Sequence, residues 1–138
     1  MKILGRHLIV ELSQCNQVKL DDQRLMEQYL NEAVRRCGAT IVQSVFHCYN
    51  PQGVSGVVVI AESHVSLHTW PEYGYAAVDF FTCGDGIDPY LAHDYLRNKL
   101  EAEEVQVREV QRGIPSPEDE VIDHKPVHQS CSEVISGV

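Results

Sequence analysis

The chain has 138 residues, a formal net charge of -9 and an isoelectric point near 5.1. This length is enough for one domain that buries a core without disulfides or a structural metal. The negative charge argues against a nucleic-acid partner, because proteins that contact the phosphate backbone carry clustered Lys and Arg. No apolar run approaches the length of a membrane span, and we find no signal or lipidation motif. Five cysteines without a CxxC pair indicate reduced thiols, so we expect a cytoplasmic protein.

The first part of the chain predicts a strand, a helix and a second strand. Residues 8–12 form an apolar run of strand length, and Asp21-Asp22 supply N-cap candidates for a helix that ends at Gly38. The apolar side chains of this helix recur on one face, at Leu25, Tyr29, Ala33 and Cys37. Residues 40–49 are rich in β-branched and aromatic side chains and predict the next strand.

Three consecutive strands follow, at residues 54–62, 64–70 and 75–82. Turn residues at 50–53 precede the first of them, and Pro71 and Gly74 mark the reversal between the last two. Strands joined this tightly pair antiparallel, because a parallel partner needs a connection of about a dozen residues.

The end of the domain predicts a helix and a last strand. Asp88-Pro89 is an N-cap followed by proline at the first helical position, and residues 105–110 form the strand. After Gly113 the composition changes to proline, acidic residues and serine, so we expect one domain at 1–112 and an extended or disordered tail at 113–138.

This order of elements predicts an α+β domain in which two helices cover one face of an antiparallel sheet. The other face also needs a cover. A homodimer that stacks two sheets would provide it, and a solvated polar face is the alternative.

Residues 61–75 gather hydroxyls, imidazoles, a carboxylate and aromatic rings in one strand-like run. A period of two puts His64, His68 and Trp70 on one face of the strand, and Ser63 on the other. A direct contact between Ser63 and His68 would therefore require a kink near the bond between residues 62 and 63, and strain there would be functional. We take Ser63, held by a rigid strand, as the candidate reactive centre.

Two histidine groups have weak metal-site patterns, and we predict no metal. His64 and His68 are too far apart on a strand to make a good zinc pair. The spacing of His124, His128 and Cys131 is typical of metal ligands, but these residues fall in the predicted tail, which offers no second shell.

Two further side chains are open to a structural and a chemical interpretation. Cys83 is either a small buried hydrophobe or a thiol at a strand end. Ser55 is either a turn residue or a hydroxyl aimed at the bond between Glu62 and Ser63 from the neighbouring strand.

A third set of residues could form a nucleoside site. Glu72 is either a solvated turn charge or an acceptor for vicinal hydroxyls such as those of a ribose. Tyr49 and Trp70 are either core residues or the two walls of a slot for a planar base.

Taken together, these residues resemble the short prokaryotic S-adenosylmethionine decarboxylase proenzymes. The resemblance runs from about residue 4 to residue 110 and rests on the segments Leu4-Gly5-Arg6-His7, 53–60, Glu62-Ser63-His64, 68–75 and Phe81-Thr82-Cys83-Gly84. Position 49 carries Tyr where the family often has Phe, a change that should keep stacking intact.

The resemblance implies that the chain cleaves itself between Glu62 and Ser63, into residues 1–62 and 63–138, and that Ser63 becomes a pyruvoyl cofactor. It implies that Ser63 Oγ attacks the Glu62 carbonyl, that His68 removes the α-proton of Ser63, and that Ser55 assists. The pyruvoyl ketone would then condense with a substrate amine and withdraw electrons as carbon dioxide leaves.

The resemblance also implies a substrate, S-adenosylmethionine, and a product, the aminopropyl donor for spermidine synthesis. Cys83 would return a proton to the product carbon, and Glu72 would bind the ribose. Tyr49 and Trp70 would stack on the adenine, with the two rings coming from different subunits of a homodimer or a dimer of processed pairs.

Three rival interpretations remain at this point. A pyruvoyl-dependent ornithine or arginine decarboxylase of the same build would keep the processing residues but needs no adenosine slot. A non-catalytic partner subunit would be expected to lose Ser63, His68 or Cys83, and the chain has all three. A metal-binding module would bind zinc through His64 and His68.

Overall fold

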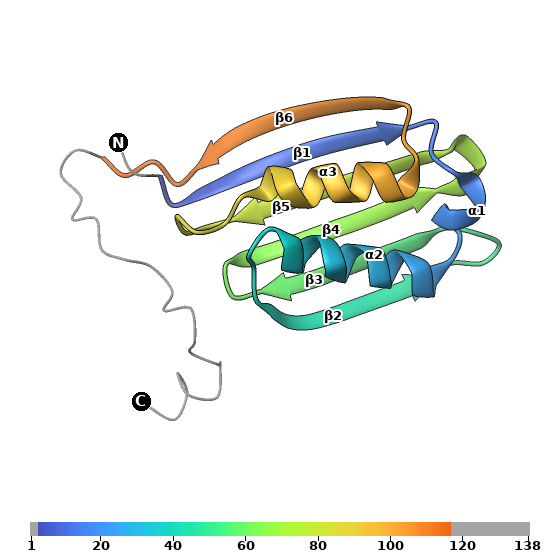
Figure 1. The fold of residues 1–138 in the computed structure, drawn as a ribbon, viewed down its shortest axis with the longest axis horizontal. Helices are drawn as coiled ribbons and strands as arrows, with labels where there is room; N and C mark the ends of the chain where they lie inside the picture. Colours follow the sequence, from blue (N-terminus) through green and yellow to red (C-terminus); the bar gives the residue numbers. More distant parts are fainter. Residues whose placement is uncertain (1–2, 117–138) are drawn as a thin grey trace.

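Six antiparallel strands form a single sheet in the computed structural model of the protein, which describes residues 3–116 (Figure 1). Their order across the sheet is β2-β3-β4-β5-β1-β6, and each neighbouring pair is antiparallel. The strands are β1 (Gly5–Ser13), β2 (Ile41–Cys48), β3 (Val54–Ile60), β4 (Ser63–Trp70), β5 (Tyr75–Thr82) and β6 (Glu104–Arg112). The predicted antiparallel sheet is therefore confirmed. The part of the predicted tail from residue 117 onward, with His124, His128 and Cys131, lies outside the described residues.

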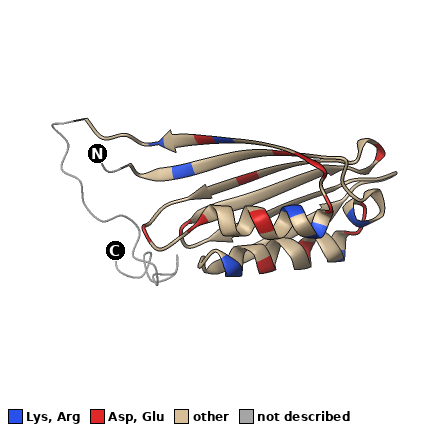
Figure 2. Ribbon diagram, turned by 45° about the horizontal axis from the view of Figure 1, so that its top comes forward, with Lys and Arg blue, Asp and Glu red and all other residues tan. Residues whose placement is uncertain are grey.

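Two long helices, α2 (Gln23–Arg36) and α3 (Pro89–Leu100), lie side by side on one face of the sheet (Figures 1 and 2). Their starts follow the predicted chemistry, because Asp22 accepts a hydrogen bond from the Leu25 N–H and Asp88 accepts one from the Tyr90 N–H. The α+β class and the two covering helices are confirmed. None of the helices among residues 3–116 is long and apolar enough to cross a membrane.

Two short helical segments were not predicted. The four residues of α1 (Gln17–Leu20) and the three of η1 (Pro71–Tyr73) are too few to show a helical period in the sequence. Asn16 caps α1 by accepting a hydrogen bond from the Lys19 N–H at 3.1 Å.

The core lies between the two helices and the sheet, and it confirms the period of two along β4. Val65, Leu67 and Thr69 point into the core, whereas His64 and His68 are half-buried on the opposite face. The same face of the sheet carries other buried side chains, among them Leu8, Val10, Leu12, Val58, Val78 and Phe80.

The opposite, helix-free face of the sheet carries both apolar and polar side chains. Val45, Val57, Val59 and Val110 lie on it, since each is paired across the strands with a residue of that face, and each is exposed by 38–55%. No element among residues 3–116 covers this face, as Figure 2 shows. We call it the open face.

The predicted strand at 54–62 is wrong at its end. β3 ends at Ile60, and Ala61 and Glu62 form a two-residue turn that brings Ile60 opposite Ser63. Neither turn residue is a glycine, asparagine or proline, so the sequence has no turn signal at this point. The correction moves the bond between Glu62 and Ser63 from a strand into a tight hairpin.

Candidate active site

The backbone at Ser63 is in an unfavourable conformation. Its φ is 137°, whereas neither Ala61 nor Glu62 has a positive φ. In the favoured two-residue hairpins the turn residues themselves take positive φ, usually as Asn or Gly. Here the first residue of the following strand takes it instead, and such a backbone costs about 1–3 kcal/mol. The backbone is therefore irregular at Ser63, but the regular pairing of β4 does not bring Ser63 to His68.

The carbonyl group of this strained bond accepts a hydrogen bond. The Cys83 N–H donates to the Glu62 carbonyl oxygen at 2.8 Å, because Cys83 follows β5 directly and Thr82 is paired with Ser63. A backbone N–H at this place would stabilise the negative charge that forms when a nucleophile attacks the carbonyl carbon. Cys83 is half-buried and does not belong to the buried core, which favours the chemical interpretation of its position.

A second group of polar side chains lies on the open face at the other end of β4. Ser55 of β3 is paired with His68 of β4, and its Oγ lies 2.7 Å from His68 Nδ1. The Tyr49 hydroxyl, just beyond the end of β2, donates to Ser55 Oγ at 3.1 Å. β3, β4 and the residue that follows β2 thus supply a hydrogen-bonded chain of phenol, hydroxyl and imidazole.

The two groups are far apart within one chain. Ser63 and His68 are five residues apart on a strand whose pairing is regular, and a strand rise of 3.2–3.4 Å per residue separates their Cα atoms by about 16 Å. Ser55 is opposite His68, and Ile60 is the β3 residue opposite Ser63. The expectation that Ser55 is aimed at the 62–63 bond of its own hairpin is therefore wrong.

Both candidate stacking residues are exposed, which argues against the core interpretation. Tyr49 is 52% exposed and Trp70 is 41% exposed. The Trp70 ring lies 5.3 Å from the Tyr75 ring, and the Tyr75 hydroxyl donates to Glu11. Burial and then this hydrogen bond raise the pKa of Tyr75 to about 12, so its phenol stays a proton donor.

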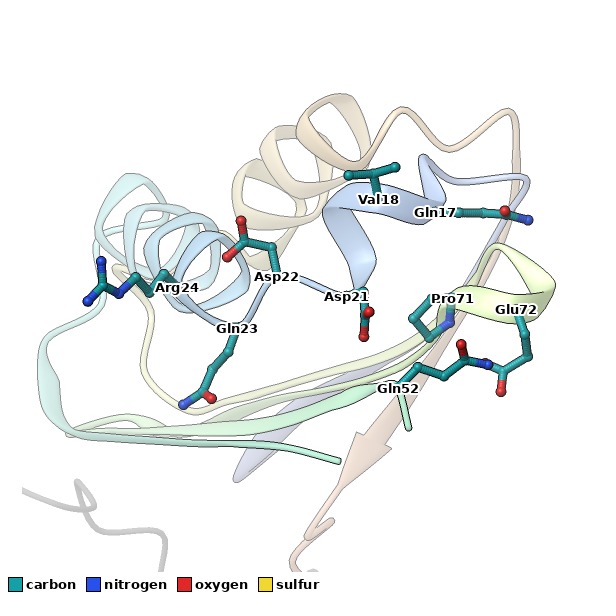
Figure 3. Close-up of a pocket in the computed structure, with 9 residues that line it drawn as sticks. All are labelled: Gln17, Val18, Asp21, Asp22, Gln23, Arg24, Gln52, Pro71 and Glu72. Atoms are coloured by element: carbon teal, nitrogen blue, oxygen red, sulfur yellow. The ribbon is translucent and has the colours of Figure 1, made fainter. Parts of the chain in front are cut away.

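Glu72 is exposed in η1, at the same end of β4 as His68 and Trp70. Its side chain borders a surface hollow of about 670 Å³ on the helix side of the sheet end (Figure 3). The hollow is lined by Gln17, Val18, Asp21, Asp22, Gln23, Arg24, Gln52, Pro71 and Glu72. Glu72 is the only residue that the hollow shares with the candidate site, so we do not identify the hollow with the reactive centre.

An ionic group on the open face was not predicted from the sequence. Asp79 of β5 accepts a hydrogen bond from Ser66 Oγ at 3.0 Å and lies 3.3 Å from His7 Nε2. Arg112 Nη1 lies 3.1 Å from His7 Nδ1, and since a guanidinium only donates, His7 accepts there and donates to Asp79 through Nε2. The one signal in the sequence is Asp79 itself, a charge between the apolar residues of β5.

The metal interpretation gains no support from the described part of the chain. Residues 3–116 contain no cluster of three or more His, Cys, Asp or Glu side chains that could hold a metal ion. His64 stacks on Phe81 with ring centroids 5.6 Å apart, and His68 bonds to Ser55.

The site combines a serine with a strained backbone and, directly before it, a carbonyl group that accepts a backbone hydrogen bond, on the sheet of an α+β domain. Comparison with known proteins identifies the class of protein to which this site belongs. The model of the family described as S-adenosylmethionine decarboxylase matches residues 6–113, and the chain belongs to this family. That match spans both groups of candidate residues.

Similar proteins support the same assignment. A protein of Thermotoga maritima named S-adenosylmethionine decarboxylase proenzyme is 53% identical over 123 residues, which cover 86% of this chain and 95% of that protein. A protein of the same name from Thermodesulfovibrio yellowstonii is 46% identical over 134 residues, which cover 97% of this chain and 99% of that protein. The crystal structure of the adenosylmethionine decarboxylase from Aquifex aeolicus matches this structure with a TM-score of 0.80 and 36% sequence identity. The match covers 88% of this chain and 100% of the Aquifex chain.

The strain at Ser63 predicts an unusual order of stability for two variants that cannot form an ester. Because glycine adopts positive φ without a steric cost, we expect Ser63→Gly to be more stable than Ser63→Ala by about 1 kcal/mol. Urea unfolding of both intact chains measures this difference. Ser66, with an ordinary backbone, is the control, and there the alanine variant should be the more stable one. An alanine variant that is also the more stable at position 63 would show that the backbone there is not strained.

Proposed function

We propose that the protein is made as an inactive precursor, cleaves itself between Glu62 and Ser63, and then decarboxylates S-adenosylmethionine. The observation that carries this proposal is the strained backbone of Ser63 beside the Glu62 carbonyl, to which the Cys83 N–H donates. Membership of the S-adenosylmethionine decarboxylase family supports it, as do relatives named proenzymes at 46–55% identity.

The first step exchanges an amide for an ester. Ser63 Oγ attacks the Glu62 carbonyl carbon, the new C–O bond forms, the C–N bond breaks, and the amine of Ser63 takes up a proton. The Cys83 N–H holds the oxygen on which negative charge develops. Breaking the peptide bond releases the strain at Ser63, which favours the ester.

The second step is a β-elimination. His68 removes the α-proton of Ser63, the bond between the ester oxygen and Cβ breaks, and Glu62 leaves as a carboxylate. Water then converts the dehydroalanine to a pyruvoyl group with loss of ammonia. When His68 Nδ1–H donates to Ser55, the lone pair of Nε2 is available as the base, which gives Ser55 its supporting role.

The residues near Ser63 suit the pyruvoyl group that this reaction would leave at position 63. The group supplies a ketone that condenses with the substrate amine and takes up electrons as carbon dioxide leaves. Cys83, which follows Thr82, the β5 residue paired with Ser63, would return a proton to the product carbon. From the His68 end of β4, Glu72 would accept hydrogen bonds from the ribose hydroxyls, and the exposed rings of Tyr49 and Trp70 would stack on the adenine.

The distance between the two groups of residues leads us to include a second copy of the chain. About 16 Å separate Ser63 from His68 in one chain, too far for proton transfer. If two open faces stack about a two-fold axis that runs across the strands, the Ser55–His68 end of one chain lies over the Ser63–Cys83 end of the other. The exposed valines of the open face support such a homodimer, which also follows from the need to cover a sheet face.

Two further parts of the proposal rest on the composition of the chain. We place the enzyme in the cytoplasm because its cysteines form no disulfide-like pattern. We propose no nucleic-acid partner because the net charge is -9.

Self-cleavage predicts two chains in the purified protein. Mass spectrometry should find residues 1–62 with a free carboxyl group and residues 63–138 with a pyruvoyl group that blocks N-terminal sequencing. Ser63→Ala lacks the nucleophile, so it should stay one inactive chain. Efficient cleavage of this variant would contradict the mechanism.

The adenosine site predicts a preference among substrates. Mature enzyme should release labelled carbon dioxide from carboxyl-labelled S-adenosylmethionine and not appreciably from ornithine or arginine. Glu72→Gln should raise the KM for S-adenosylmethionine and leave self-cleavage unchanged, because cleavage needs no nucleoside. Release from ornithine or arginine instead would keep the pyruvoyl chemistry and replace the substrate.

A site shared between two chains predicts complementation. We expect neither Ser63→Ala nor His68→Ala alone to be cleaved efficiently. When the two are co-expressed with different tags, a mixed dimer has one site that combines Ser63 of the His68→Ala chain with His68 of its partner. The His68→Ala chain should then be cleaved, which a gel resolves by tag. If it stays intact in mixed dimers, His68 does not act on the other chain's Ser63.

A further inference from the structure

The side chain of Glu62 is buried, although it belongs to a two-residue turn. It is only 6% exposed, whereas charged side chains in tight turns are usually solvated. Within residues 3–116 it forms no salt bridge, and its Oε1 accepts a hydrogen bond from the Thr40 N–H at 3.0 Å. A buried carboxylate with one backbone donor loses much of its hydration, so its place in the turn calls for a reason other than stability.

The surroundings of Glu62 do not neutralise its charge. The nearby Cys37 thiol, at the end of α2, has its pKa raised first by burial, and the charge of Glu62 adds to the rise. The end of a helix is also the negative end of its dipole. The contact that holds the Glu62 side chain in place is therefore the hydrogen bond from the Thr40 N–H, and not an ion pair.

Thr40 and Cys83 together hold the turn at three points. The Thr40 carbonyl accepts from the Ala61 N–H at 2.9 Å, and the Thr40 N–H donates to the Glu62 carboxylate. The Cys83 N–H donates to the Glu62 carbonyl. The two backbone contacts are independent of the Glu62 side chain, so the carboxylate is the one anchor that a substitution can remove.

An unfavourable backbone angle persists only where its neighbours leave no room to relax. Ser63 is paired on both sides, with Ile60 and with Thr82, so relaxation of its φ requires rotation of the peptide unit that joins it to Glu62, which would also break the hydrogen bond from the Cys83 N–H. The anchored carboxylate opposes that rotation. Without the anchor, the φ of Ser63 could relax toward negative values and carry Oγ away from the carbonyl carbon.

We propose that the Glu62 side chain is a positioning residue for self-cleavage, which holds the scissile carbonyl and the strained Ser63 in the attacking geometry through its hydrogen bond to the Thr40 N–H. The inference rests on the proposed function and adds a role for the side chain of the residue that precedes the cleaved bond. The hydrogen bond requires a side chain long enough to reach the Thr40 N–H and an acceptor oxygen at its end. It does not require a charge.

Three substitutions separate reach from charge. Glu62→Gln keeps the length and the acceptor oxygen without the charge, Glu62→Asp keeps the charge but is one methylene shorter, and Glu62→Ala removes both. The matched control is Glu103→Ala, which removes an exposed carboxylate from the turn between α3 and β6. The rate of self-cleavage of each full-length precursor is followed on denaturing gels, and circular dichroism verifies that each variant folds.

We expect Glu62→Gln and Glu103→Ala to cleave within about threefold of the unmodified chain, and Glu62→Ala and Glu62→Asp to be slower by about tenfold or more. The intact fraction of the slow variants should resist hydroxylamine, which cuts esters, because the block precedes ester formation. A general loss of structure would not be rescued by glutamine alone. If Glu62→Ala does not fold, the glutamine and aspartate variants decide the question.

Two results would overturn the inference. Cleavage of Glu62→Ala at the rate of the unmodified chain would show that the side chain does not position the bond. A glutamine variant as slow as the alanine or aspartate variant would show that charge, or an exact fit of the carboxylate, matters in place of the hydrogen bond. If the unmodified chain itself does not cleave, the proposed function fails, and this outcome is distinct from the other two.

Discussion

The pairing of β4 with β3 and β5 is the constraint on which the rest of the structure depends. It fixes Ser63 opposite Ile60 on one side and Thr82 on the other, and so prevents the backbone of the two-residue turn from relaxing. The resulting φ of 137° costs about 1–3 kcal/mol, which a domain with a stability of about 5–15 kcal/mol can tolerate. A regular sheet thus holds one irregular residue at the place where chemistry is proposed.

The same regularity divides the candidate site into two groups. Because the two groups lie at opposite ends of one strand, the proposed mechanism brings them together across an interface between two chains. The open face between them carries the ionic group of His7, Asp79 and Arg112 beside exposed valines. A polar group among apolar side chains suits a surface that binds one specific partner. A partner without complementary groups would leave these charges unpaired.

The sequence predicted local features well where a residue type has a strong local preference. Asp22 and Asp88 begin the two long helices, and Gly38, with φ of 90°, ends the first. It failed at the turn of Ala61 and Glu62, whose residue types are ordinary for a strand end, so that tertiary pairing alone decides where β3 stops. It also missed Asp79 as part of an ionic group, because His7 lies 72 residues away along the chain.

By itself, the sequence determined the α+β class, the faces of β4 and the residue types of the candidate site, since these follow from periodicity and from the motif around Ser63. Only the tertiary structure decided which of those residues meet. Strand register brings Ser55 to His68, brings the Cys83 N–H to the Glu62 carbonyl, and keeps the two pairs apart. The physical reason is that periodicity depends on neighbours in the chain, whereas register and backbone strain depend on pairing between strands that the sequence does not align.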